Sequence, residues 1–128
     1  MHGFKIAEQG HVVSMLSPVD VTAATSSEVI NLENWSHVTF ICMKGAGSSA
    51  TIVVEECDDF VPTNVATIPY SYAQEATAAG DTLTALAAAG TAGIASGTAS
   101  GVLLVIEIDA DELSDGFPYI RLKCADPG

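Results

Sequence analysis

The densest cluster of residues that could do chemistry in this sequence is acidic and lies near its C-terminal end. Asp109, Asp111 and Asp115 follow a predicted strand, and carboxylate oxygens on a turn are ligands that Ca²⁺ accepts. An EF-hand loop, however, needs an oxygen ligand at its fifth position, where this sequence has Leu113. The pattern therefore favours a solvated turn, in which Asp109, Asp111 and Asp115 are the residues that would hold a metal if one bound.

The other chemistry-bearing residues match no catalytic or phosphate-binding template. His2, His11 and His37 stand at no metal-ligand spacing from a cysteine or from one another. The sequence has no G-x-S-x-G nucleophile elbow, and no Lys-Ser/Thr pair follows Gly45 and Gly47 as a phosphate loop requires. We therefore predict a protein that is not an enzyme and that needs no cofactor.

Charge and composition exclude several classes of partner. Sixteen acidic and four basic residues give the 128-residue chain a net charge of −12, which repels nucleic acid and anionic lipid. The N-terminus lacks the apolar core of a signal peptide, and no apolar run is as long as a membrane span. Three cysteines without close spacing fit a reducing compartment. We expect synthesis in a cytoplasm and contact with neither nucleic acid nor membrane.

Four segments have clear strand patterns and are predicted to form two hairpins. Residues 37–44 alternate in apolar character, and residues 50–57 follow them after the flexible loop GAGSS. Residues 102–108 form an apolar run rich in β-branched side chains, and residues 119–124 alternate again after the acidic turn.

Weaker signals lie between these hairpins. Residues 11–16 are a short strand candidate, and residues 66–72 are another, in which Pro69 indicates a sheet edge or a bulge. Residues 73–101 consist largely of Ala, Gly, Thr and Ser. Ala-rich propensity there suggests a short helix near 82–89, whereas threonine alternation and flanking glycines favour extended structure, with 82–85 paired to 93–98.

About seven or eight short strands without a strong amphipathic helix predict an all-β fold. Their spacing is typical of an antiparallel β-sandwich or a jelly-roll-like arrangement. We expect a flexible N-terminal arm over residues 1–10 and a single sandwich domain over residues 11–128.

Several predicted strands carry apolar residues on both faces. Leu103 and Val105 lie opposite the main apolar face of their strand, and Ile41 and Met43 do the same in residues 37–44. Either the 73–101 segment covers this second face, or another subunit does. The candidate partner-contacting residues are the apolar ones on this second face and in that segment: Leu103, Val105, Ile41, Met43, Leu83, Leu86 and Ile94.

Two motifs carry a resemblance to a known family. VEECDDF at 54–60 and EIDADELSDGFPYIRLK at 107–123, in this order, resemble small structural proteins from the head-and-tail gene clusters of tailed bacteriophages and prophages. The similarity spans roughly residues 28–124. It implies a virion protein made in a bacterial host, with the major capsid protein as partner and a homotrimer as its assembled form. Head decoration or cementing is the favoured role.

Two other roles remain open at this point. One is a tail or neck component that binds other tail proteins. The other is a small ligand-binding β-sandwich for carbohydrate or Ca²⁺, although the aromatic residues do not gather on one predicted strand face.

Overall fold

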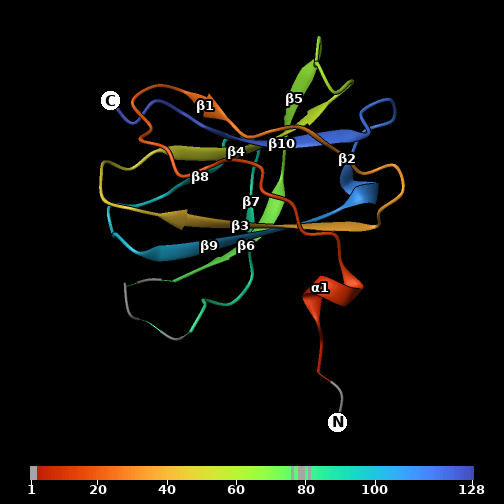
Figure 1. The fold of residues 1–128 in the computed structure, drawn as a ribbon. Helices are drawn as coiled ribbons and strands as arrows, with labels where there is room; N and C mark the ends of the chain where they lie inside the picture. The colour runs from red at the N-terminus through yellow and green to blue at the C-terminus, as the bar shows by residue number, and fades with distance from the viewer. Residues whose placement is uncertain (1–2, 76, 78–79, 81) are drawn as a thin grey trace.

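The chain folds into two antiparallel β-sheets packed face to face, in a computed structural model that describes residues 3–75, 77, 80 and 82–128 (Figure 1). The elements are, in chain order, α1 (Ile6–Gln9), β1 (Thr25–Ser26), β2 (Ile30–Asn31), β3 (His37–Lys44), β4 (Thr51–Cys57), β5 (Val65–Ile68), β6 (Tyr70–Gln74), β7 (Ala87–Ala89), β8 (Ile94–Ala95), β9 (Val102–Asp109), the 3-10 turn η1 (Ala110–Glu112) and β10 (Tyr119–Cys124). The predicted all-β sandwich is confirmed.

Each sheet is named here after its two longest strands. The β4–β10 sheet has the order β1-β10-β4-β5, with β2 also paired to β10 and β8 also paired to β4. The β3–β9 sheet has the order β3-β9-β6-β7. Within the described residues, no helix is long and apolar enough to cross a membrane.

Strand β9 shows why the sequence folds this way. Its side chains alternate between buried and half-buried positions, and Ile106 and Ile108 have no exposed surface. Val54 of β4 and Ile120 of β10 are equally buried in the facing sheet, so the core forms between the two layers. The alternating pattern of each long strand therefore determines which of its faces turns inward.

Both predicted hairpins are wrong, because the chain changes sheet at each of those connections. Strand β3 pairs with β9, in a register that runs from His37 opposite Asp109 to Lys44 opposite Val102. Strand β4 instead pairs with β10 and β5. A strand has the same alternating pattern whether the next strand lies beside it in one sheet or across the core in the other sheet. The sequence therefore could not distinguish a hairpin from an arch, in which the chain crosses from one sheet to the other.

Pro69 divides the strand predicted over residues 66–72. Strand β5 before it belongs to the β4–β10 sheet and β6 after it to the β3–β9 sheet, so Pro69 stands at a corner between the layers. Tyr70, the next residue, donates its hydroxyl hydrogen bond to the Ile52 carbonyl of β4, 2.7 Å away. Burial raises the pKa of Tyr70 to about 12, which keeps the hydroxyl protonated as this bond between the sheets requires.

Two weaker expectations about secondary structure also need correction. Residues 11–16 form no strand, and only Met15 among them packs against the core. No helix forms at 82–89: residues 87–89 are β7, paired with β6, and β8 pairs with β4, so the predicted 82–85 to 93–98 hairpin is absent. The arm predicted over residues 1–10 contains the single helical turn α1, while residues 1 and 2, with His2, lie outside the described residues.

Candidate interaction surface

The outer face of the β3–β9 sheet carries the apolar side chains that the sequence places on the second face of residues 37–44 and 102–108. Because β3 and β9 are in register, Ile41 lies opposite Val105 and Met43 opposite Leu103. Ala73 of β6 lies on the other side of Val105. We call Ile41, Met43, Leu103 and Val105 the outer patch.

The outer patch is open to solvent. Ile41 is 64% exposed and Met43 is 76% exposed, while Leu103 and Val105 are half-buried between the neighbouring strands. Full burial of one side chain of this size contributes roughly 1.5–3 kcal/mol, and a partner that covered Ile41 and Met43 would gain the part of each contribution that their exposed surface represents. Side chains of this kind clustered on a sheet face are typical of a binding surface.

A charged cluster continues the same face toward the other end of the strands. The His37 ring lies between two carboxylates of β9, with Nδ1 2.6 Å from Asp109 Oδ1 and Nε2 2.6 Å from Glu107 Oε2. Thr39 donates its hydroxyl hydrogen bond to the same Glu107 oxygen, also at 2.6 Å. We call His37, Thr39, Glu107 and Asp109 the imidazole cluster.

The imidazole cluster favours a protonated ring. A neutral imidazole has one N–H and can donate to only one of the two carboxylates, whereas the imidazolium donates to both. Partial burial of His37 opposes protonation, but the hydrogen bonds and charges of Asp109 and Glu107 outweigh it and raise its pKa above the ordinary 6.5. The outer face of the β3–β9 sheet therefore has two parts: the apolar outer patch, and the imidazole cluster, whose charge depends on pH.

The other predicted contact residues lie outside strands β3 and β9. Leu83 and Leu86 are exposed on the segment that leads to β7, which Thr84 holds against the end of β6 by hydrogen bonds with Gln74. Ile94 of β8 packs against the core instead. Four of the seven predicted residues therefore share one face.

The three candidate metal ligands are separated by the fold. Asp109 faces His37, while Asp111 and Asp115 line a surface hollow of about 630 Å³ beside Trp35. The Asp109 side chain also caps η1, and Glu112 accepts a hydrogen bond from the Asp109 backbone N–H. Among the residues that the structure describes, no three His, Cys, Asp or Glu side chains form a group that could hold a metal ion.

The carboxylates near the end of β4 have partners within the fold. Glu55 and Glu56 are buried: Arg121 Nε lies 2.7 Å from the Glu55 carboxylate, and Glu56 accepts a hydrogen bond from the Ser114 N–H. Asp58 is half-buried, and its carboxylate holds the loop before β5 through hydrogen bonds from Asn64 and Thr63, which lower its pKa. These carboxylates therefore serve the fold.

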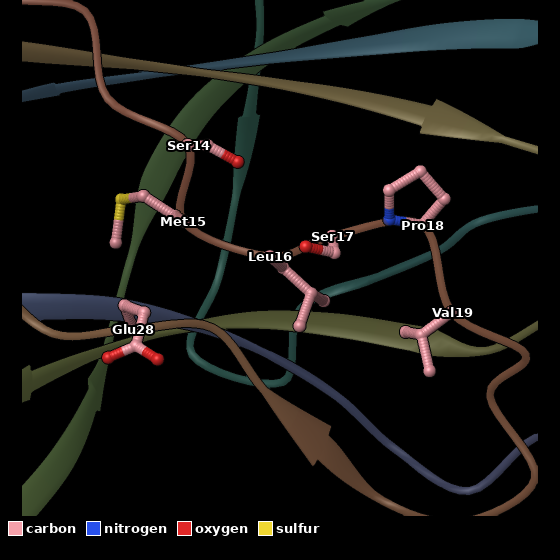
Figure 2. Close-up of a pocket in the computed structure, with 7 residues that line it drawn as sticks. All are labelled: Ser14, Met15, Leu16, Ser17, Pro18, Val19 and Glu28. Atoms are coloured by element: carbon pink, nitrogen blue, oxygen red, sulfur yellow. The ribbon is translucent and has the colours of Figure 1, made fainter.

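A second surface hollow lies where the N-terminal segment passes the β4–β10 sheet. It encloses about 440 Å³ and is lined by residues 14–19 and Glu28 (Figure 2). Its lining is apolar and hydroxyl-bearing, with Glu28 as the one carboxylate among those residues. This arrangement pairs no nucleophile with a base and offers no catalytic geometry.

The cysteines are free and belong to the interior. Cys57 is buried, and Cys42 and Cys124 pack against the core from opposite sheets. Burial, with a contribution from the neighbouring Cys124, raises the pKa of Cys42 to about 11, and burial also raises the pKa of Cys57 and Cys124. Thiols held protonated in this way are poor nucleophiles.

Comparison with known proteins identifies no relative: no family model, curated protein or solved structure matches the chain. The surface must therefore be interpreted from its own geometry. Sequence reasoning found the outer patch through alternation, but it missed the imidazole cluster, because about seventy residues separate His37 from its partners. Only the β3–β9 register brings them together.

Proposed function

We propose that this chain is a non-enzymatic virion structural protein of a tailed bacteriophage, and that it decorates the outside of the assembled head. The outer patch is the observation that supports a binding role. The assignment to a phage virion rests on the sequence resemblance at 54–60 and 107–123. In this role the protein acts as a small symmetric oligomer, a homotrimer, that contacts the major capsid protein.

The mechanism is mass action. A protein that binds only the assembled shell lowers the free energy of that shell relative to its separated subunits. The outer patch supplies apolar area for this contact, and the carboxylates of the imidazole cluster suit a basic border on the partner. A net charge of −12 suits the outer surface of the head, away from packaged DNA.

The test compares two threonine variants on heads assembled from the major capsid protein of the phage that carries this chain. Ile41→Thr/Met43→Thr removes apolar area from the outer patch and keeps β-forming side chains. Val61→Thr, in the loop before β5, is the control, because Val61 is as exposed as Met43 but lies away from the patch. Binding is measured by co-sedimentation, and each variant's melting temperature is recorded.

We expect the double variant to lose co-sedimentation at an unchanged melting temperature, while Val61→Thr binds like the wild type. Wild-type protein that never sediments with heads would refute the decoration role. Sedimentation with tails instead would assign the chain to the tail or neck. Equal head binding by the double variant would show that a different surface makes the contact.

The hollow beside Trp35 supports a second candidate, a carbohydrate-binding module. Trp35 is 48% exposed and lines this hollow with Phe117, Asp111 and Asp115, a combination of aromatic faces and carboxylates that suits sugar rings. Tryptophan fluorescence during titration with soluble oligosaccharides from the host cell surface tests it. A saturable change in the fluorescence of Trp35, the one tryptophan of the chain, that Asp111→Ala/Asp115→Ala abolishes would favour this function over decoration.

A further inference from the structure

Strand β3 leaves one long sheet edge unpaired. It has eight residues and pairs with β9 on one side only. The other edge strands are much shorter: β5 has four residues, β7 has three, and β1, β2 and β8 have two each. Short strands are one of the ways in which proteins protect sheet edges, and β3 lacks this protection.

The free edge of β3 is regular and offers backbone groups in a row. Ala110 N–H donates to the Ser36 carbonyl at 2.9 Å, and this bond extends the register that places His37 opposite Asp109. Because hydrogen-bonded pairs alternate along an antiparallel ladder, the N–H and C=O of Thr39, Ile41 and Met43 point away from β9. Within the described residues, no backbone hydrogen bond from another segment reaches them.

The N-terminal arm, residues 3–14, is a matching segment whose backbone pairs with no strand in the described residues, although the His11 ring packs edge-on against Trp35. Its sequence HVVS at 11–14 predicts a strand, yet the structure leaves it unpaired, with Val12 68% and Val13 49% exposed. Phe4 and Ile6 are exposed as well, and the single turn of α1 buries no residue. One isolated helical turn is marginal, so straightening it costs little.

The arm does not pair with β3 of its own chain. Met15, which follows the arm, packs against the core, and its carbonyl accepts a hydrogen bond from Glu28 N–H at 2.8 Å. From α1 to this anchor the chain runs across the direction of β3, toward the β4–β10 sheet (Figure 1). Extended, the twelve arm residues would span up to about 40 Å, enough to reach a neighbouring molecule.

We infer that the arm of one copy of this chain pairs as an added strand with the free edge of β3 in a second copy. Main-chain hydrogen bonds of this kind give affinity, and the exposed valines gain contacts beside the outer patch. Charge supports a second copy as the occupant. Strand β3 contains no acidic side chain, and the one acidic residue of the arm, Glu8, lies 3.3 Å from Lys5, so contact between arm and β3 brings few like charges together although the chain carries sixteen acidic residues.

This inference concerns association of the chain with itself and does not rest on the proposed virion role. The test uses the full chain with Val13→Pro, which removes one N–H from the arm in a segment whose backbone belongs to no strand. Val61→Pro is the control, an exposed valine in a loop. Sedimentation velocity measures association, and amide hydrogen exchange reports on Thr39, Ile41 and Met43.

We expect the wild type and Val61→Pro to associate, and Val13→Pro to associate at least about tenfold more weakly, equivalent to about 1.4 kcal/mol. The three β3 amides exchange slowly in the wild-type assembly and rapidly in Val13→Pro. If Val13→Pro fails to fold, Val12→Asp is used, because it adds a like charge at an exposed position. A monomeric wild type, or a proline variant that associates normally with protected β3 amides, overturns the inference.

Discussion

Gly93 lies where the turn before β8 meets β4. Its φ of +76° is in the left-handed region, and a Cβ added there would stand 2.2 Å from the Ile52 carbonyl oxygen and 2.7 Å from a Val53 methyl carbon. Gly97 has almost the same φ, +72°, but nothing within 4 Å of the added atom. Substitution of Gly97 therefore tests backbone strain alone, whereas substitution of Gly93 tests the same strain together with steric overlap.

We predict that Gly97→Ala lowers the free energy of unfolding by about 1 kcal/mol, from left-handed strain alone. Gly93→Ala should lower it by about 3 kcal/mol or more, because β4 or the turn must also move. Urea denaturation of both variants measures the difference. Equal losses would mean that the turn before β8 shifts freely and that its contact with β4 contributes little.

His37 makes stability depend on pH near neutrality. Because its pKa is raised in the folded protein, the imidazole cluster stabilises the fold fully below pH 6.5, and the contribution disappears as pH rises through the folded pKa. The His37 side chain is 43% exposed, so solvent screening limits the effect to about 1 kcal/mol or less.

We predict that the melting temperature of the wild type falls relative to His37→Gln between about pH 6 and pH 8. His11→Gln is the matched control, because His11 lies outside the imidazole cluster and packs edge-on against Trp35 at 5.7 Å. Parallel pH profiles for the wild type and His37→Gln would contradict the role assigned to the imidazole cluster.

At the scale of the elements, the pairing of β4 with β10 depends on a buried charge. Glu55 lies opposite Arg121 in this register, and only 5% of its side chain is exposed. Arg121 Nε is 2.7 Å from one carboxylate oxygen, and Lys123 Nζ is 3.5 Å from the other. Removing Arg121 would leave the buried Glu55 carboxylate with Lys123 as its cation, which lies farther away and is more exposed than Arg121.

We predict that Arg121→Met destabilises the protein by about 3 kcal/mol, while Lys123→Met costs under about 1 kcal/mol. The double variant Glu55→Gln/Arg121→Met should recover part of the loss, because no buried charge remains unpaired. Chemical denaturation of the single and double variants measures this cycle. An Arg121→Met protein as stable as the wild type would show that Lys123 alone balances Glu55.

At the scale of the whole molecule, the isolated chain leaves much apolar surface in water. The exposed large apolar residues are Phe4, Ile6, Val12, Val13, Leu16, Val19, Trp35, Ile41, Met43, Phe60, Val61, Val65, Leu83 and Leu86. Six of them belong to the arm (Phe4, Ile6, Val12 and Val13) and to the outer patch (Ile41 and Met43). Exposed apolar side chains grouped in this way suit a chain that buries them when it associates with another molecule.

We therefore predict that the melting temperature rises when the protein concentration is raised about a hundredfold, since association stabilises the folded state by mass action. Differential scanning calorimetry at both concentrations measures the shift. Val13→Pro should show a smaller shift or none. A transition that is independent of concentration in the wild type would indicate a monomer.

The long strands could be predicted from the sequence because their alternation is a local property. Residues 37–44 form β3 with the predicted bounds, and the apolar residues of β9 divide between its faces as expected. The outer patch followed from the same pattern, since a period of two assigns every side chain to one face. Local patterns thus determined the fold class, the long strands and the apolar half of the candidate interaction surface.

Only the tertiary structure decided which strands are neighbours. The same alternation fits a hairpin and an arch, so the pairing of β3 with β9 and of β4 with β10 depends on how the two layers pack. The imidazole cluster and the Glu55–Arg121 pair exist only in those registers. The free edge of β3 likewise arises because β4, its successor in sequence, lies across the core and not beside it.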